Sequence, residues 1–290
     1  FLSLQPDLAV ITNVEHDHPD CYPTFADFRA AFESFAALVP DEGMLAVCAD
    51  DPVARAIGQA QADETTVQFF GLSDEAAWRA EEIHPNFAGG VDFLAMHGEE
   101  MLGLVRLRVP GAHNASNAMA ALVVADSLGV PFSVAREALT DFRGVARRFE
   151  LKGEAGGVVI IDDYAHHPTE IQATLRAARE RFPERRVWAV WQPHTYSRTK
   201  ELLDRFAASF DDADRVIVLP IYPARETDAL GVSAADVVDA MEHADASVVS
   251  TMEEAVDRLL KAVRPNDVVL TLGAGDGDQV GERLLSQLGG

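Results

Sequence analysis

The second half of this 290-residue sequence alternates apolar runs with segments of helical periodicity, and this alternation limits the possible folds more than any other feature. Five runs rich in valine and isoleucine predict buried strands at residues 157–161, 187–191, 215–219, 246–249 and 268–272. Helical spacing predicts helices at residues 169–182, 200–210, 233–242, 252–263 and 279–288. Strands that alternate with helices of this length are typical of βαβ units on a parallel sheet. We therefore predict a doubly wound, mostly parallel α/β domain for this half.

The first half also predicts α/β structure, but with a less regular pattern. The apolar runs predict strands at residues 8–12, 44–48, 67–70, 91–95 and 102–109, of which the last two suit a hairpin. Helical spacing predicts helices at residues 25–38, 114–128 and 133–142. The periodicity pauses at Arg147 and Arg148. We therefore predict two domains, 1–147 and 148–290.

The composition excludes several classes of protein. The chain has 24 Lys and Arg against 47 Asp and Glu, a formal net charge of −23, which argues against nucleic acid as a partner. Small phosphate ligands stay possible, since backbone amides, a metal ion or one or two arginines can hold them. No apolar run approaches the ~20 residues of a membrane span. Cys21 and Cys48 are the only cysteines, which fits a reducing cytoplasm.

Polar side chains follow four predicted strands of the second half, at the point where each strand ends. These segments are residues 162–167, 192–198, 222–225 and 273–276. In an open parallel sheet the carboxyl ends of the strands share one edge, where ligands bind. Any single histidine or acid here could be an ordinary loop residue or helix cap. The set, with three histidines and two arginines, predicts a binding edge.

Residues 12–20 of the first half, which follow another predicted strand, interleave His16 and His18 with acidic residues. Such mixed nitrogen and oxygen ligands could hold magnesium or manganese. The alternative is an Asx-rich turn with a helix cap, and the spacing alone does not decide between them.

Asn114 and Asn117 lie three residues apart at the start of a predicted helix, and so on one face of it. Their paired amides could bind the edge of a purine, but Asn114 capping the helix is the simpler interpretation. Arg147 and Arg148 could bind a phosphate or could be an exposed linker pair.

Neither common glycine-rich nucleotide motif is present. The sequence has no Gly-x-x-x-x-Gly-Lys-Ser/Thr phosphate loop, and its only lysines are Lys152, Lys200 and Lys261. The Gly273-Ala274-Gly275 run lacks the third glycine of a dinucleotide-binding fingerprint.

Seven motifs together resemble the Mur ligase family along the whole chain. They occur in the family's order and share its pattern of acids, histidines and asparagines. The motifs are residues 12–18 (TNVEHDH), 49–52 (ADDP), 111–117 (GAHNASN), 147–149 (RRF), 162–170 (DDYAHHPTE), 192–199 (QPHTYSRT) and 273–276 (GAGD). This chain is therefore similar to the later part of the family's central ATPase domain followed by its C-terminal amino-acid-binding domain.

The resemblance implies roles for individual residues. It implies that ATP and Mg²⁺ are the cofactors, with His18 as a magnesium ligand, and that Arg148 and Asp163 contact ATP. It places Asn114 and Asn117 at the adenine, with His113 beside them. His166, His194 and Arg198 match positions near the incoming amino acid and the reacting carboxylate. The family's UDP-sugar domain and phosphate loop have no counterpart, so we interpret the chain as a fragment that is inactive alone.

The activity that the resemblance implies is ATP-dependent joining of L-alanine to the lactyl carboxylate of UDP-N-acetylmuramate, through an acyl phosphate, in bacterial peptidoglycan synthesis. Its expected partners are these two substrates, without nucleic acid or membrane insertion, in the cytoplasm. The nearest alternative is a recycling ligase that adds a whole tripeptide; residues 192–199 and Tyr164 favour alanine. The alternative from a different functional class is that the chain binds ligands but catalyses no reaction. The residues do not show which histidine acts as the base.

Overall fold

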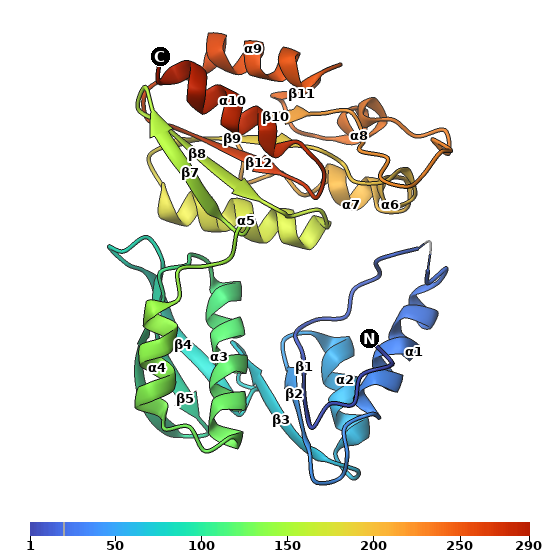
Figure 1. Cartoon of the computed structure of the whole chain (residues 1–290), viewed down its shortest axis with the longest axis vertical. Coiled ribbons are helices and arrows are strands. Elements are labelled where there is room, and N and C mark those ends of the chain that lie inside the picture. The colour runs from blue at the N-terminus through green and yellow to red at the C-terminus, as the bar shows by residue number, and fades with distance from the viewer. Residues whose placement is uncertain (20) are drawn as a thin grey trace. The chain divides into compact units, whose positions relative to one another are not determined.

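The computed structural model describes residues 1–19 and 21–290. The chain divides into two compact units, Phe1–Arg143 and Gly144–Gly290, and each is described by itself (Figure 1). Among the described residues, no helix is both long and apolar enough to cross a membrane.

The first unit is built on a six-stranded sheet whose strands lie in sequence order. The first four strands are parallel, and the last three form an antiparallel meander. The strands are β1 (Leu8–Ile11), β2 (Met44–Cys48), β3 (Thr66–Gly71), β4 (Trp78–Pro85), β5 (Val91–His97) and β6 (Glu100–Arg106). The helices are α1 (Phe25–Ala36), α2 (Pro52–Gln61), α3 (Ala112–Ser127) and α4 (Phe132–Asp141).

Strand β2 explains why this sheet is covered on both faces. All five of its residues are buried. Met44, Ala46 and Cys48 pack in one apolar cluster with α3. Leu45 and Val47 face the other way, into a cluster with α1 and α2. A strand that is buried on both faces gives the continuous apolar run that predicted it.

Two elements of the first unit are absent from the sequence prediction, whereas the predicted hairpin of β5 and β6 is confirmed. Helix α2 is short, and Asp51 begins it by accepting hydrogen bonds from the N–H groups of Val53 and Ala54, at 3.1 and 2.7 Å. Strand β4 carries polar and charged residues that interrupt an apolar pattern, and only Trp78 and Ala80 are buried. Helix α2 does bury one face at helical spacing, with Ala54, Ile57 and Gly58, whereas β4 depends mainly on its pairing with β3 and β5.

The second unit has a six-stranded sheet in the order β11-β10-β9-β12-β8-β7. Every pairing is parallel except that of β7 with β8. The strands are β7 (Glu150–Ala155), β8 (Val158–Asp163), β9 (Arg186–Trp191), β10 (Arg215–Val218), β11 (Ala246–Val248) and β12 (Asp267–Leu272). The helices are α5 (Pro168–Arg181), α6 (Tyr196–Glu201), α7 (Leu203–Ala207), α8 (Ala234–Ala240), α9 (Met252–Ala262) and α10 (Asp278–Leu288).

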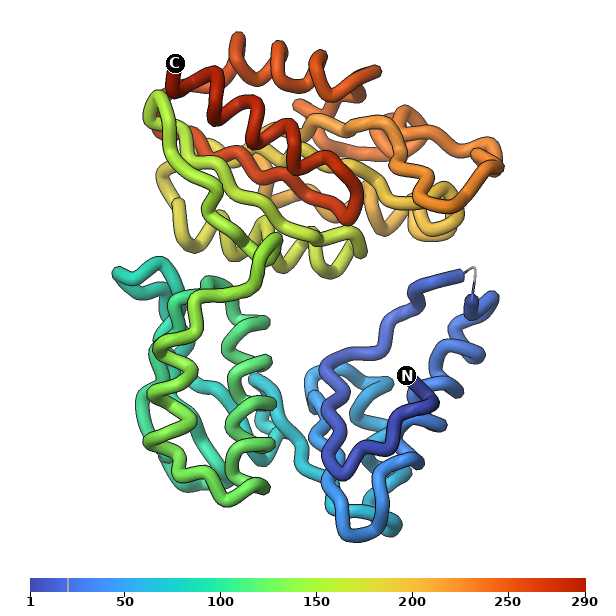
Figure 2. Tube along the Cα trace, viewed as in Figure 1, coloured from blue at the N-terminus to red at the C-terminus, as the bar shows by residue number. Residues whose placement is uncertain are grey.

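Helices cover both faces of this second sheet (Figure 2). Ile171 of α5, Phe206 of α7 and Val237 of α8 pack in one apolar cluster. Leu259 of α9 and Leu284 of α10 pack in a separate cluster. The prediction of a doubly wound, mostly parallel α/β domain is therefore confirmed.

The sequence prediction for the second unit was wrong in two places. Strand β7 was not expected, because its polar residues are only half-buried or exposed. The helix expected at residues 200–210 is instead two short helices, α6 and α7, that meet at Leu202. The expected cap of α9 is present, since the Thr251 side chain accepts a hydrogen bond from Glu254 N–H at 3.1 Å.

Candidate functional site

The polar segments of the second unit gather at one edge of its sheet. Strands β8, β12 and β9 are parallel neighbours, so the residues that follow them lie at the same end. The Gln192 side chain donates to the Asp276 carboxylate at 2.9 Å and accepts from the N–H of Gly277 at 2.9 Å. These bonds join the segments that follow β9 and β12. The candidate site is therefore a connected edge of the sheet.

Asp163, at the end of β8, holds the backbone on both sides of it. Its carboxylate accepts hydrogen bonds from the N–H groups of Phe149 and Ala165, each at 2.8 Å. Burial raises the pKa of Asp163 to about 6, although these two donors and the charge of Arg148 act in the opposite direction. A carboxylate that is 5% exposed and bonded in this way fixes the backbone at this edge of the sheet.

Arg147 clamps the start of the second unit to the same edge. Its guanidinium donates to the Asp162 carboxylate at 2.9 Å and to the carbonyls of Gly273 and Gly275 at 2.9 and 3.1 Å. It also lies over the Tyr164 ring, 5.2 Å from the centroid. The exposed-linker interpretation of Arg147 is therefore wrong.

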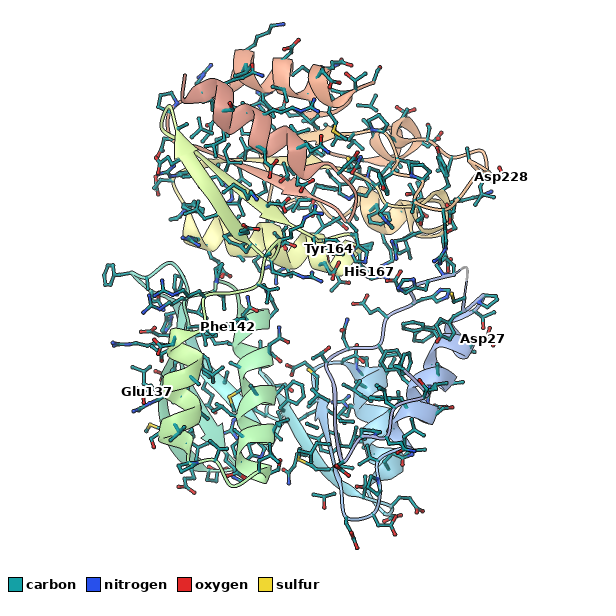
Figure 3. All side chains as sticks on the ribbon, in the orientation of Figure 1. Asp27, Glu137, Phe142, Tyr164, His167 and Asp228 are labelled. Atoms are coloured by element: carbon teal, nitrogen blue, oxygen red, sulfur yellow. The ribbon has the colours of Figure 1, made fainter. Side chains whose placement is uncertain are left out.

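Arg148 points to a different partner. Its guanidinium lies 3.3 Å from the Glu170 carboxylate and is half exposed. Glu170, near the start of α5, also accepts hydrogen bonds from the N–H groups of His166 and His167, at 2.9 and 3.2 Å. The segment between β8 and α5, on which Figure 3 labels Tyr164 and His167, is thus tied to Arg148 through one carboxylate.

His194 and Arg198 follow β9 and lie together. The Arg198 guanidinium is 3.1 Å from Nδ1 of His194, and the Arg198 residue is only 4% exposed. The His194 ring stacks on Tyr222, with 5.6 Å between centroids. The His166 ring is 6.2 Å from that of His194. The structure therefore brings His166, His194 and Arg198 together.

In the first unit, the two histidines that follow β1 differ. The His16 ring bonds the Tyr22 carbonyl at 2.9 Å and lies beside the rings of Phe25 and Phe28. His18 is exposed, with Nε2 at 3.8 Å from the Asp17 carboxylate. Within residues 1–19 and 21–290, no three His, Cys, Asp or Glu side chains gather as a metal site. Asp20 of the predicted loop lies outside the described residues.

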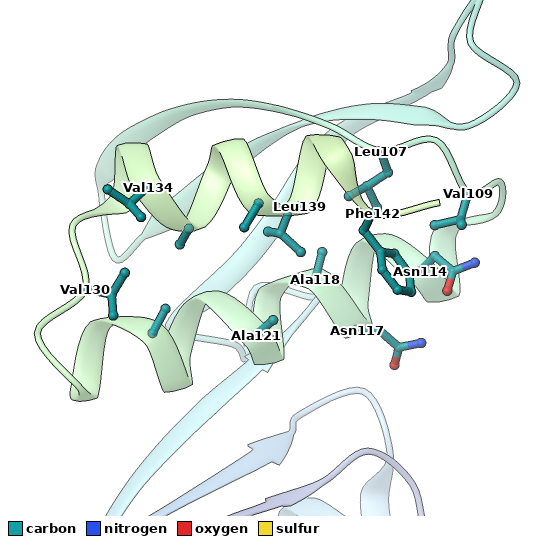
Figure 4. Close-up of a pocket in the computed structure, with 13 residues that line it drawn as sticks. Leu107, Val109, Asn114, Asn117, Ala118, Ala121, Val130, Val134, Leu139 and Phe142 are labelled. Atoms are coloured by element: carbon teal, nitrogen blue, oxygen red, sulfur yellow. The ribbon is translucent and has the colours of Figure 1, made fainter. Parts of the chain in front are cut away.

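Asn114 and Asn117 line one end of a pocket of about 570 Å³ between α3 and α4 (Figure 4). The rest of the lining is almost wholly apolar, from Leu107 to Phe142. The Asn114 amide donates to the Pro110 carbonyl at 2.8 Å and contacts His113 Nε2 at 3.1 Å. Gly111 is the N-cap of α3, so the interpretation of Asn114 as its cap is wrong. An apolar slot with two amides at one end suits a flat heterocycle that has polar edges.

Sequence reasoning missed the roles of Arg147 and Glu170. Arg147 binds carbonyls 126 and 128 residues away, a pairing that no local pattern reveals. Glu170 had a local signal, because an acid three residues after the N-cap is typical of a capping box.

Comparison with known proteins gives two family matches. Residues 1–125 match the Mur ligase middle domain, and residues 147–275 match the Mur ligase glutamate ligase domain. A protein of Caldanaerobacter subterraneus subsp. tengcongensis named UDP-N-acetylmuramate–L-alanine ligase is 40% identical over 289 residues. A protein of that name from Salinibacter ruber is 44% identical over 280 residues. These matches cover 99% and 95% of this chain but 62% and 58% of the relatives.

Solved structures agree with this assignment. The crystal structure of UDP-N-acetylmuramate-alanine ligase from Thermotoga maritima aligns with a TM-score of 0.77 at 25% identity, over 99% of this chain and 60% of that one. A MurF ligase from the same organism, in complex with ADP, has the same fold, with a TM-score of 0.78 at 21% identity over 98% of this chain and 62% of that one. One family match lies in each of the two units. The chain belongs to the Mur ligase family.

Proposed function

We propose that the protein containing this chain joins L-alanine to the lactyl carboxylate of UDP-N-acetylmuramate and consumes ATP. The relatives at 40–44% identity that carry this activity in their names support the proposal. The observation that carries it is the grouping of His166, His194 and Arg198 at one sheet edge. This set offers a guanidinium for a carboxylate and ring nitrogens that can exchange a proton with an amine.

The first step in this proposal is phosphorylation of the lactyl carboxylate to an acyl phosphate. The apolar pocket of α3 and α4 takes the adenine, with Asn114 and Asn117 at its polar edge and His113 alongside. Arg148 and Asp163 contact ATP from the second unit. The guanidinium of Arg148 offsets the charge that accumulates when phosphate and carboxylate meet.

Magnesium would be held mostly by the nucleotide's phosphates, since Mg²⁺ keeps several waters and takes few protein ligands. His18 is exposed and fits the role of a single protein ligand. When bound, the ion supplies Lewis-acid stabilisation of the transferred phosphoryl group.

In the second step the amine of L-alanine attacks the acyl phosphate. The Arg198–His194 pair holds the amino acid's carboxylate, and a histidine takes the proton of its ammonium group. We assign residues 1–147 to ATP binding and 148–290 to amino-acid binding, in a bacterial cytoplasmic enzyme. Residues 1–290 alone are expected not to turn over ATP, because they contain no phosphate loop.

The test uses a chimera in which the unmatched N-terminal part of the Caldanaerobacter relative precedes Phe1. ADP formation is followed with UDP-N-acetylmuramate, ATP and Mg²⁺, and with either L-alanine or the stem tripeptide. Turnover with L-alanine supports the proposal. Turnover with the tripeptide alone would replace it with the recycling reaction, and no turnover with either would reject both.

A further inference from the structure

His166 and His194 have neighbouring rings, but their Nδ1 atoms face partners of opposite kind. In His166, Nδ1 lies 2.9 Å from the carbonyl oxygen of Tyr164 and 3.5 Å from a carboxylate oxygen of Glu170. Both partners only accept hydrogen bonds, so Nδ1 carries the proton. In the neutral ring the lone pair is therefore on Nε2.

His194 has the opposite arrangement. Its Nδ1 lies 3.1 Å from a guanidinium nitrogen of Arg198, and a guanidinium can only donate. Nδ1 of His194 is therefore the acceptor, and the neutral ring carries its proton on Nε2. Arg198 is 4% exposed and the ring stacks on Tyr222, so both side chains are held in place.

We propose that Glu170 is a positioning residue that fixes His166 as the base for the incoming amine, while Arg198 fixes His194 as a hydrogen-bond donor. This proposal rests on the proposed function, because that function identifies the incoming amine as L-alanine. An amino acid presents an ammonium group beside a carboxylate. An acceptor at His166 and a donor at His194, with ring centroids 6.2 Å apart, match those two groups.

The proton balance of the step is complete. Nε2 of His166 takes one proton from the ammonium group and becomes an imidazolium, which later loses the proton to water. The free amine forms the new C–N bond, and the C–O bond to phosphate breaks. The second proton lost by the nitrogen leaves with phosphate, and one remains on the amide.

Glu170 is placed to stabilise the imidazolium. Burial acts to raise the pKa of Glu170, but the His166 ring, its N–H group and Arg148 together hold that pKa below its ordinary value, so the carboxylate stays ionised. In the second unit, the titratable and charged groups around His166 include Glu170 on α5, Tyr164 beside it, His194 after β9, and Arg148 through Glu170. The carboxylate orients the ring as it does in other histidine-based sites.

The direct test is nuclear magnetic resonance of the whole ¹⁵N-labelled chain. Long-range ¹H–¹⁵N correlations report which ring nitrogen is protonated, and His166→Gln and His194→Gln identify the two signals. We expect a proton on Nδ1 of His166 and on Nε2 of His194 once the rings are neutral. The reverse tautomer in either ring would overturn the proposal.

A second measurement tests Glu170 itself. Glu170→Gln keeps an oxygen for the two N–H groups but removes the charge beside Nδ1, so the fraction of neutral His166 rings with the proton on Nδ1 should fall by about half or more. Glu254→Gln is the matched control, because Glu254 also accepts a backbone N–H at a helix start and pairs with an arginine, Arg258. A fraction of Nδ1-protonated His166 that changes equally, or not at all, in both variants would overturn the role of Glu170.

The activity measurement uses the chimera and hydroxylamine, which is already neutral near pH 7 and captures acyl phosphates as hydroxamates. His166→Gln should lower kcat with L-alanine by about 10²-fold or more while hydroxamate formation continues. An equal loss of both products would overturn the assignment of the base. Absence of hydroxamate from the unaltered chimera would instead reject the proposed function, and the tautomer result would stand by itself.

Discussion

The guanidinium of Arg147 lies 2.9 Å from the carboxylate of Asp162, and Asp162 is almost completely buried. Burial acts to raise the pKa of Asp162, while the hydroxyl of Thr271 and Arg147 act to lower it. One residue at the start of the second unit therefore compensates a charge in the interior of its sheet. Arg147 adopts a left-handed backbone conformation, with φ of 59°, in making this contact.

Arg147→Met should destabilise the second unit by about 3–5 kcal/mol, because it leaves a buried carboxylate without its partner. Arg148→Met is the matched control, since its half-exposed pair with Glu170 is worth about 1 kcal/mol or less. Urea unfolding followed by far-ultraviolet circular dichroism measures both. Equal urea midpoints for the two variants would contradict the stabilising role of Arg147.

The second unit should fold by itself, provided that it includes Arg147. Residues 144–290 contain both apolar clusters of its sheet and the clamp. A fragment of residues 149–290 lacks the partner of Asp162 and should be less stable by a similar amount, about 3–5 kcal/mol. Thermal unfolding compares the two fragments. Identical melting temperatures would show that the contacts of Arg147 are dispensable for stability.

Asp163 should titrate near pH 6, well above an ordinary aspartate. Because the folded pKa lies above the unfolded one, its contribution to stability is complete below about pH 4 and is lost as the pH rises through 6. The loss amounts to about 3 kcal/mol. Carboxyl ¹³C shifts measure the midpoint, with Asp163→Asn as the assignment control. A midpoint below 4 would contradict the inferred effect of burial.

Asn114→Ala and Asn117→Ala should each weaken ATP binding to the chimera about five- to tenfold, through loss of about one hydrogen bond. Preference for ATP over GTP should fall as well. Ser127→Ala, at the far end of α3, is the control, because its hydroxyl bonds the Val124 carbonyl in the same helix and Ser127 does not line the pocket. Isothermal titration calorimetry gives the affinities; unchanged values in both asparagine variants would place the adenine elsewhere.

Gly273→Ala should destabilise the second unit by about 2–4 kcal/mol. A β-carbon there would lie 2.6 Å from the Gln192 carbonyl, and the backbone has φ of +138°. Gly289→Ala is the control, since its φ is −91° and the nearest atom lies at 3.4 Å. Denaturant midpoints compare the two, and a neutral Gly273→Ala would show that the segment after β12 can shift.

The buried parallel strands were predictable because they are apolar on both faces. All six residues of β8 are buried, and its first four, Val158–Ile161, form a continuous apolar run that encodes it. Strand β7 lies at the edge of the same sheet and keeps polar residues, so only its pairing with β8 defines it. The break at Leu202 has no glycine or proline to mark it.

The residues of the candidate site were predictable as types, but their partners were not. His166, His194 and Arg198 follow strands whose carboxyl ends must meet in a parallel sheet. Which ring nitrogen carries a proton depends on a carbonyl and a guanidinium placed by the fold. The clamp of Arg147 depends on Gly273 and Gly275, which approach it only because β12 lies beside β8.

Strand β12 is the last strand to be synthesised, yet it lies between β9 and β8 near the middle of its sheet. While the chain is still emerging from a ribosome, β8 and β9 both lack their shared neighbour and expose open hydrogen-bonding edges. The sheet can close only after residue 272 is free, because β12 pairs with both β8 and β9. The second unit is therefore expected to complete its sheet only once β12 has emerged, and to need protection from edge-to-edge association until then.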